Sequence, residues 1–164
     1  MSWPARWMRI APVAEEAGRW AILAALAGAQ RETDPPLAVW VQGNLRHDWA
    51  FVVPRRFAPG KPSRRAAWAL SPAIALCRQF GVPAYFEADG LHLHGQPWAG
   101  CRVEMVGECL VATSCMTIPF PVESHVEDCF RLRVEAQYDW CFETSWPNPV
   151  EANAIAEARS EYAW

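Results

Sequence analysis

The chain has 164 residues, a length that suits a single domain over residues 1–164 with its own hydrophobic core. A composition of 52% hydrophobic and 20% charged residues argues against an intrinsically disordered chain. The net charge of −3 gives no reason to expect nucleic acid as a partner, and no apolar run approaches the roughly 20 residues that a membrane span requires.

The first third of the chain predicts a helix followed by a pair of strands. Residues 12–30 are rich in alanine and leucine and carry two glutamates near their start, which favours a helix. The pair Pro35-Pro36 ends this helix, because two prolines in succession cannot continue it. Residues 37–41 and 49–53 then predict strands joined by a turn at 43–44.

The middle of the chain predicts a second helix and a meander of strands. A loop rich in proline over residues 54–63 precedes the helix, which covers 64–80 and ends at Gly81. Pro72 predicts either a kink in this helix or a fresh start at Ser71. After Gly81, alternating apolar and polar residues predict antiparallel strands over 82–86, 91–94, 98–106 and 108–116.

The last third predicts two more helices. Ser124 and Glu127 have the spacing of a capping box that opens a helix to about residue 137. Asn148 and Pro149 open a final helix to about residue 162. Helices combined with a mainly antiparallel sheet, in a chain without internal repeats, predict an α+β domain.

The N-terminal stretch and the cysteines both indicate a cytoplasmic protein. Pro4 and Pro12 interrupt the N-terminal stretch, which is unlike a secretory signal peptide. None of the six cysteines forms a CxxC pair, and intracellular chains keep their thiols reduced. We therefore expect most of them to be small buried hydrophobic residues.

Two segments carry a resemblance to a known superfamily. The first is Ala38–Leu45, a short apolar strand followed by a Gly-Asn-Leu turn. The second runs from Gln79 through Gly-Val-Pro-Ala and a hairpin to Gly100, and the strand after it carries Thr113-Ser114. In this order and spacing the segments resemble the biotin/lipoate protein ligase superfamily, and within it the lipoate ligases and octanoyltransferases.

The resemblance implies a biotin/lipoate protein ligase-like architecture and a ligand site. The ligand would be a lipoyl, octanoyl or biotinyl group, and the partner an acidic acyl-carrier or lipoyl domain protein. The site residues that it implies are Gly43, Asn44, Leu45, Asp89, Gly95, Pro97, Gly100, Thr113 and Ser114.

Two departures from the family pattern change the expected chemistry. Family members have an arginine- and glycine-rich loop before the Gly-Asn-Leu turn, where this chain has Asp34-Pro35-Pro36-Leu37. Family members also place a lysine, which contacts the activated carbonyl and phosphate, where this chain has Pro97; its single lysine is Lys61. Proline offers neither an N–H donor nor a charge. We therefore expect the chain to bind the ligand or its carrier without ATP-dependent ligation.

Three further groups of residues are candidate functional sites. Cys101 and Cys115 flank the expected cleft, so a second hypothesis is a cysteine-dependent acyltransferase. A third hypothesis is a non-catalytic interaction subunit, in which tryptophans and a basic loop bind a carrier protein. Alternatively, that loop is an ordinary solvent-exposed segment. The loop carries Arg55, Arg56, Lys61, Arg64 and Arg65. His92 and His94 share one strand face, but no further ligand has recognisable spacing, so no metal site is expected.

Overall fold

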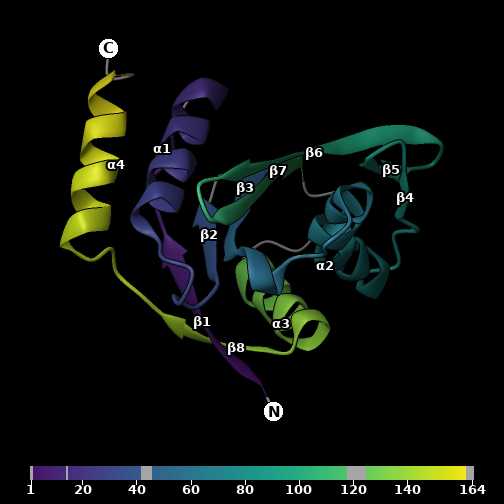
Figure 1. Ribbon diagram of the computed structural model, residues 1–164. Coiled ribbons are helices and arrows are strands. Elements are labelled where there is room, and N and C mark those ends of the chain that lie inside the picture. The colour runs from purple at the N-terminus through teal and green to yellow at the C-terminus, as the bar shows by residue number, and fades with distance from the viewer. Residues whose placement is uncertain (1, 14, 42–45, 118–124, 162–164) are drawn as a thin grey trace.

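One eight-stranded sheet runs through the molecule, with α1 and α4 on one face and α2 and α3 on the other (Figure 1). The computed structural model describes residues 2–13, 15–41, 46–117 and 125–161. The helices are α1 (Glu16–Ala29), α2 (Arg65–Gln79), α3 (Val126–Tyr138) and α4 (Pro149–Glu161), with short 3₁₀ turns η1 (Arg55–Phe57) and η2 (Pro62–Arg64). In sheet order the strands are β4 (Tyr85–Glu87), β5 (Gly90–Leu93), β6 (Gln96–Val106), β7 (Cys109–Thr117), β3 (Arg46–Pro54), β2 (Leu37–Val41), β1 (Trp3–Arg9) and β8 (Trp140–Thr144).

The sheet is mixed but mainly antiparallel. Only β1 is paired in parallel, with β2 on one side and β8 on the other, among the strands that the structure describes. The other neighbours, from β4 to β2, pair antiparallel. The predicted α+β class is therefore confirmed. Within the described ranges, no helix is long and apolar enough to cross a membrane.

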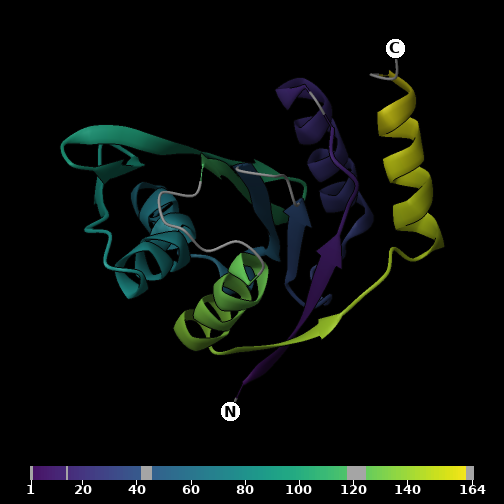
Figure 2. The same cartoon turned by 180° about the vertical axis from the view of Figure 1, so that it is seen from behind.

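The sheet separates two hydrophobic cores, because successive side chains of a strand point to opposite faces. In β3, Trp49 and Phe51 belong to the core beneath α2 and α3, whereas Ala50 and Val52 belong to the core beneath α1 and α4. Figure 2 shows from behind that α1 and α4 lie on one side of the sheet and α2 and α3 on the other. The α2–α3 core is rich in aromatic rings, and Phe130 of α3 lies among them, 5.1 Å from Trp49 between ring centroids.

Most predicted elements are present, with small differences at their ends. α1 begins four residues later than the start predicted at residue 12, and β3 extends the predicted strand 49–53 at both ends. α2 continues through Pro72, which is buried, so neither a break nor a late start at Ser71 occurs. α4 begins as predicted: Asn148 Oδ1 accepts a hydrogen bond from the Glu151 N–H at 2.8 Å.

Two strands were missed in the sequence, and the predicted capping box of α3 lies partly outside the described residues. Strands β1 and β8 were not predicted, because Pro4 interrupts the first and the second is a short segment directly after a helix. At the start of α3, Ser124 lies outside the described residues and His125 is the N-cap, without a side-chain cap. Glu127 Oε2 accepts hydrogen bonds from Trp7 Nε1 and Arg9 Nε, each at 2.7 Å, and the predicted bond to the Ser124 N–H falls outside the described residues.

A buried ion pair fastens α4 to the sheet. The Glu151 side chain is fully buried, and its two oxygens accept hydrogen bonds from both Nη atoms of Arg6 in β1, at 2.7 and 2.8 Å. Gln30 Nε2 and the Asn148 N–H also donate to this carboxylate, at 2.6 and 3.0 Å. Burial by itself would raise the pKa of Glu151, but these hydrogen bonds, led by that of Arg6, lower it.

We predict that Glu151→Gln lowers the free energy of unfolding by about 2–3 kcal/mol at neutral pH, because it leaves Arg6 without its counter-charge. Since the folded-state pKa of Glu151 is lowered, this stabilisation is complete above the ordinary pKa of glutamate. It is lost as the pH falls through the folded-state pKa, so the two proteins should converge in acid. Urea denaturation across the pH range measures this, with the exposed Glu157→Gln in α4 as the control. Equal stability of the Glu151→Gln and Glu157→Gln variants at neutral pH would contradict the prediction.

Candidate functional site

A cleft opens on the α1 face of the sheet. It has a volume of about 490 Å³, within the usual range of small-molecule sites. The start of α1 forms one wall, and the sheet residues of β3, β6 and β7 form the floor. Its lining residues are Glu16, Arg19, Trp20, Arg46, Asp48, Gly100, Cys101, Arg102, Thr113, Ser114 and Cys115.

Three arginines from three different elements meet in this cleft. Arg19 belongs to α1, Arg46 to β3 and Arg102 to β6. The guanidinium of Arg102 lies over the indole of Trp20, 3.6 Å from its centroid, which is a cation–π contact. Because guanidinium groups stay protonated at any physiological pH, the cleft keeps this positive charge.

Asp48 lies between two of the arginines without a close hydrogen bond to either. Its Oδ2 is 3.6 Å from Arg19 Nε, and its Oδ1 is 4.0 Å from Arg46 Nε. Oδ1 is buried and has no hydrogen-bond partner within the described residues. Arg46 Nε donates instead to Cys115 Sγ. These loose contacts leave guanidinium donors of Arg46 available to an anionic ligand.

The site residues predicted from the sequence divide into three groups. Gly100, Thr113 and Ser114 do line the cleft, although the Ser114 hydroxyl donates to the Gly100 carbonyl at 2.6 Å. Asp89, Gly95 and Pro97 are exposed residues of the β4–β5–β6 hairpins and do not line the cleft. Gly43, Asn44 and Leu45 lie outside the described residues.

Both candidate cysteines border the cleft, but their side chains point to opposite faces of the sheet. Cys115 contacts Arg46 on the α1 face, whereas Cys101 packs against the core beneath α2 and α3. Burial raises the pKa of Cys101 to about 12 and is also the main cause that raises the pKa of Cys115 to about 11. A cysteine nucleophile needs a lowered pKa, so these environments do not favour the acyltransferase hypothesis.

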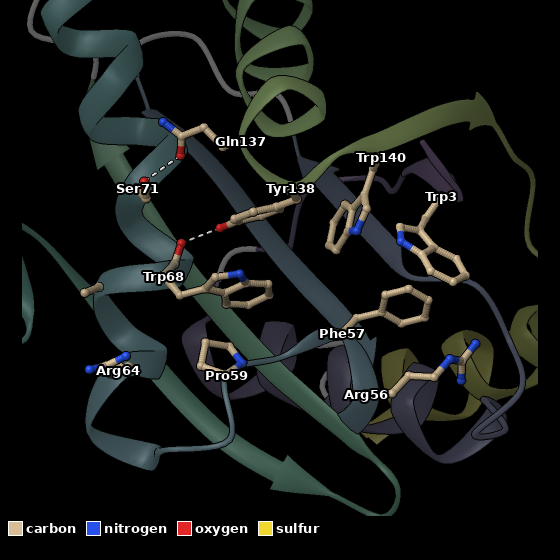
Figure 3. Close-up of a pocket in the computed structure, with 11 residues that line it drawn as sticks. Trp3, Arg56, Phe57, Pro59, Arg64, Trp68, Ser71, Gln137, Tyr138 and Trp140 are labelled. Atoms are coloured by element: carbon tan, nitrogen blue, oxygen red, sulfur yellow. Dashed lines mark hydrogen bonds between the residues drawn. The ribbon is translucent and has the colours of Figure 1, made fainter. Parts of the chain in front are cut away.

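The basic loop lies far from the cleft. It begins at Arg55, directly after β3, whereas the cleft adjoins Asp48 near the other end of that strand. At about 3.3 Å per residue, these two ends of β3 are roughly 20 Å apart. Arg56 and Arg64 instead line a second cavity, on the α2–α3 face, together with a cluster of aromatic rings (Figure 3).

The histidine pair gives no metal site in the part of the chain that the structure describes. His92 in β5 stacks on Tyr85, with ring centroids 5.7 Å apart, and His94 follows the strand with a φ of 50°. Among the described residues, no group of three or more histidine, cysteine, aspartate or glutamate side chains is placed to hold a metal ion.

The charged residues of the cleft were not predicted from the sequence. Arg19, Arg46 and Arg102 are separated by long stretches of chain and belong to no motif. Only the sheet order, which places β6 and β3 on either side of β7, brings the last two together. Strand alternation did predict that Arg102 faces away from Cys101, and this is what the structure shows.

Comparisons with known proteins identify the fold. No protein-family profile and no curated protein sequence matches the chain. Solved structures do match over nearly its whole length. A bipartite lipoate protein ligase from Thermoplasma acidophilum, solved as a system with its E2 lipoyl domain, aligns over 97% of this chain and 93% of its own, at 8% identity and a TM-score of 0.73.

Two further structures support the same assignment. Lipoate-protein ligase A bound with ATP aligns over 96% of this chain and 95% of its own, at 8% identity and a TM-score of 0.77. The biotin acetyl coenzyme A carboxylase synthetase from Helicobacter pylori, with bound biotinylated ATP, aligns over 98% and 84%, at 10% identity and a TM-score of 0.59. Identities this low establish a shared fold and leave the activity open.

We predict that Cys101 reacts slowly with iodoacetamide in the native protein at about pH 7.5. A rise in pKa from 9.0 to about 12 lowers the thiolate fraction about 1,000-fold. The exposed Cys141 should therefore be modified first, and unfolding in guanidinium should equalise the two rates. Mass spectrometry of digested protein measures this, with Cys141→Ser as the control. Rapid native labelling of Cys101, or an octanoyl thioester that Cys101→Ser or Cys115→Ser abolishes, would support the acyltransferase hypothesis instead.

Proposed function

From the biotin/lipoate protein ligase fold that this chain adopts, we propose that its cleft binds an acyl ligand with a free carboxylate, of the lipoyl, octanoyl or biotinyl class, and does not ligate it in an ATP-dependent reaction. The observation that carries this proposal is the convergence of three arginines on a cleft of ligand size at Gly100 and Thr113. Both residues belong to the segments that resemble the superfamily.

The charge of the cleft supports a carboxylate ligand. Three guanidinium groups face two carboxylates, those of Glu16 and Asp48, so the lining carries an excess positive charge. Arg102 meets Glu104 only at 3.3 Å or more, on the exposed side of β6, and can exchange this contact for a ligand. A planar guanidinium binds a carboxylate through two parallel hydrogen bonds, which suits Arg102 and Arg46 to this role.

The apolar part of the ligand would lie along Trp20. A narrow extension of the cleft continues beneath α1 toward Leu23, Val39 and Val41, but its volume is only about 20 Å³. That is little more than the space of one water molecule, so an alkyl chain would enter it only if Leu23 moved. The indole of Trp20 already borders the larger cavity and offers apolar surface there.

The proposal that the protein does not carry out ATP-dependent ligation rests on the position of its single lysine and of the segments that replace the family motifs. Pro97 is an exposed residue at the start of β6, and Lys61 lies in the basic loop at the far end of β3. The segment from Asp34 to Leu37 leads into β2 at Leu37, whereas the cleft lies near the other end of that strand, where Val41 pairs with Asp48. These segments therefore place neither a lysine side chain nor a set of backbone N–H donors for a phosphate in the cleft.

The cleft suits a free ligand better than one carried on a protein docked at the basic loop. A carrier held by Arg55 and its neighbours would lie about 20 Å from the cleft, on the opposite side of the sheet. A lipoyl domain or acyl carrier remains the partner class that the fold suggests, because one matching structure includes an E2 lipoyl domain. Such a carrier would have to approach the α1 face.

We predict that isothermal titration calorimetry detects binding of lipoate, octanoate or biotin, and that Arg102→Ala and Arg46→Ala each weaken it about tenfold or more. The loss of one charge-assisted hydrogen-bond donor accounts for that magnitude. Arg159→Ala in α4, outside the cleft, is the matched control and should bind as the wild type does.

The same purified protein should fail to exchange labelled pyrophosphate into ATP with any of the three ligands. Exchange at a rate above the background without ligand would refute the non-ligating part of the proposal. Absence of binding to all three ligands, in protein shown to be folded by circular dichroism, would refute the binding part.

A further inference from the structure

Two adjoining cavities lie along the α2–α3 face, on the opposite side of the sheet from the cleft, and together we call them the groove. Its wider part, about 860 Å³, adjoins β1, β8 and η1, and its narrower part, about 410 Å³, continues between α2 and α3. Ser71 and Gln137 line both parts and hydrogen-bond to each other at 2.5 Å. Helix α2, which forms one side of the groove, has 15 residues and is about 22 Å long, the span of about seven residues of extended peptide.

The groove is basic along its whole length. Arg56 and Arg64 line the wide part, Arg78 and Arg133 line the narrow part, and neither part is lined by an aspartate or glutamate. Within the described part of the chain, none of these four arginines pairs with a carboxylate. Their bonds go to neutral groups, such as the Ala84 carbonyl for Arg78 at 2.9 Å. The groove therefore carries four positive charges on a protein whose net charge is −3.

The wide end of the groove adds an apolar pocket. Trp3 is 57% exposed, and its ring meets Phe57 edge-on with centroids 5.6 Å apart. Figure 3 shows the rings of Trp3, Phe57 and Trp140 close together, with Arg56 next to Phe57 and Arg64 farther away, beyond Trp68. An apolar side chain placed in this cavity would bury surface against the exposed ring of Trp3.

The arrangement of the rings favours a peptide over a single-stranded nucleic acid. Non-specific binding of single strands needs free ring faces on which successive bases stack. Here the Trp68 ring is already stacked on Tyr138, with centroids 4.6 Å apart and planes 19° from parallel. Trp140 is only 3% exposed. The rings thus form the walls of one pocket and offer no series of stacking platforms.

We propose that this groove binds an acidic segment of a partner protein, which lies between α2 and α3 and seats one apolar side chain against Trp3 and Phe57. The carboxylates of the segment would pair with the four arginines that have no counter-charge of their own. This inference goes beyond the ligand cleft and is independent of it, because the two surfaces lie on opposite faces of the sheet.

Fluorescence anisotropy with synthetic peptides tests the proposal. The probe is a fluorescein-labelled peptide of about ten residues, composed of glutamate and aspartate with one central tryptophan. Two comparison probes are the same peptide with lysine in place of every acidic residue, and a single-stranded oligo(dT) of equal charge. The groove variants are Arg64→Glu combined with Arg133→Glu, and separately Trp3→Ala. Arg159→Glu in α4 is the matched charge-reversal control.

The expected result is binding of the acidic peptide that weakens steeply with added salt. The double arginine variant should bind at least tenfold more weakly, Trp3→Ala should lose several-fold in affinity, and Arg159→Glu should match the wild type. Stronger binding of oligo(dT) than of the acidic peptide would overturn the proposal, as would equal affinity of the double variant or no binding of the acidic peptide. Circular dichroism establishes that each variant is folded. Binding of lipoate, octanoate or biotin is measured in a separate experiment, because it tests the cleft and not the groove.

Discussion

The contact on which most of the α2–α3 face depends is the packing of one phenylalanine against three adjacent strands. The ring of Phe130 in α3 lies 6.3 Å from Trp7 of β1, 5.4 Å from Trp40 of β2 and 5.1 Å from Trp49 of β3, between centroids. Tilted aromatic pairs of this kind each contribute about 0.5–1.5 kcal/mol beyond their buried area. They fix α3 across the sheet, and α3 in turn positions Tyr138 and the wall that it shares with α2.

Local signals in the sequence were enough to predict most of the helices and strands. Residues 37–41 form a strand with the predicted bounds, and Asn148 caps α4 as expected. β1 was missed because Pro4 lies within it, and its parallel pairing with β8 joins segments more than 130 residues apart. Pairings of such long range leave no local signal in the sequence. The superfamily resemblance, carried by short motifs and by their order and spacing, identified the fold correctly.

The candidate site was only partly predictable for the same reason. Gly100 and Thr113 belong to recognisable segments and do line the cleft. Arg46 and Arg102 carry its charge, yet each is an ordinary arginine of a strand until the sheet is assembled. The positive charge of the cleft is thus supplied by guanidinium groups from two strands and one helix. Guanidinium donates hydrogen bonds in a plane and does not release its proton, which suits it to holding a carboxylate and makes it a poor general acid.

The division of the sheet into two faces also bears on how this protein can change over time. In β6, Arg102 belongs to the cleft, whereas its neighbours Cys101 and Val103 pack toward the α2–α3 side. A mutation at one such position alters a single face and leaves the other largely untouched. Natural selection can therefore alter the side chains of one face while those of the opposite face stay unchanged, so the two surfaces of the sheet can diverge at different rates.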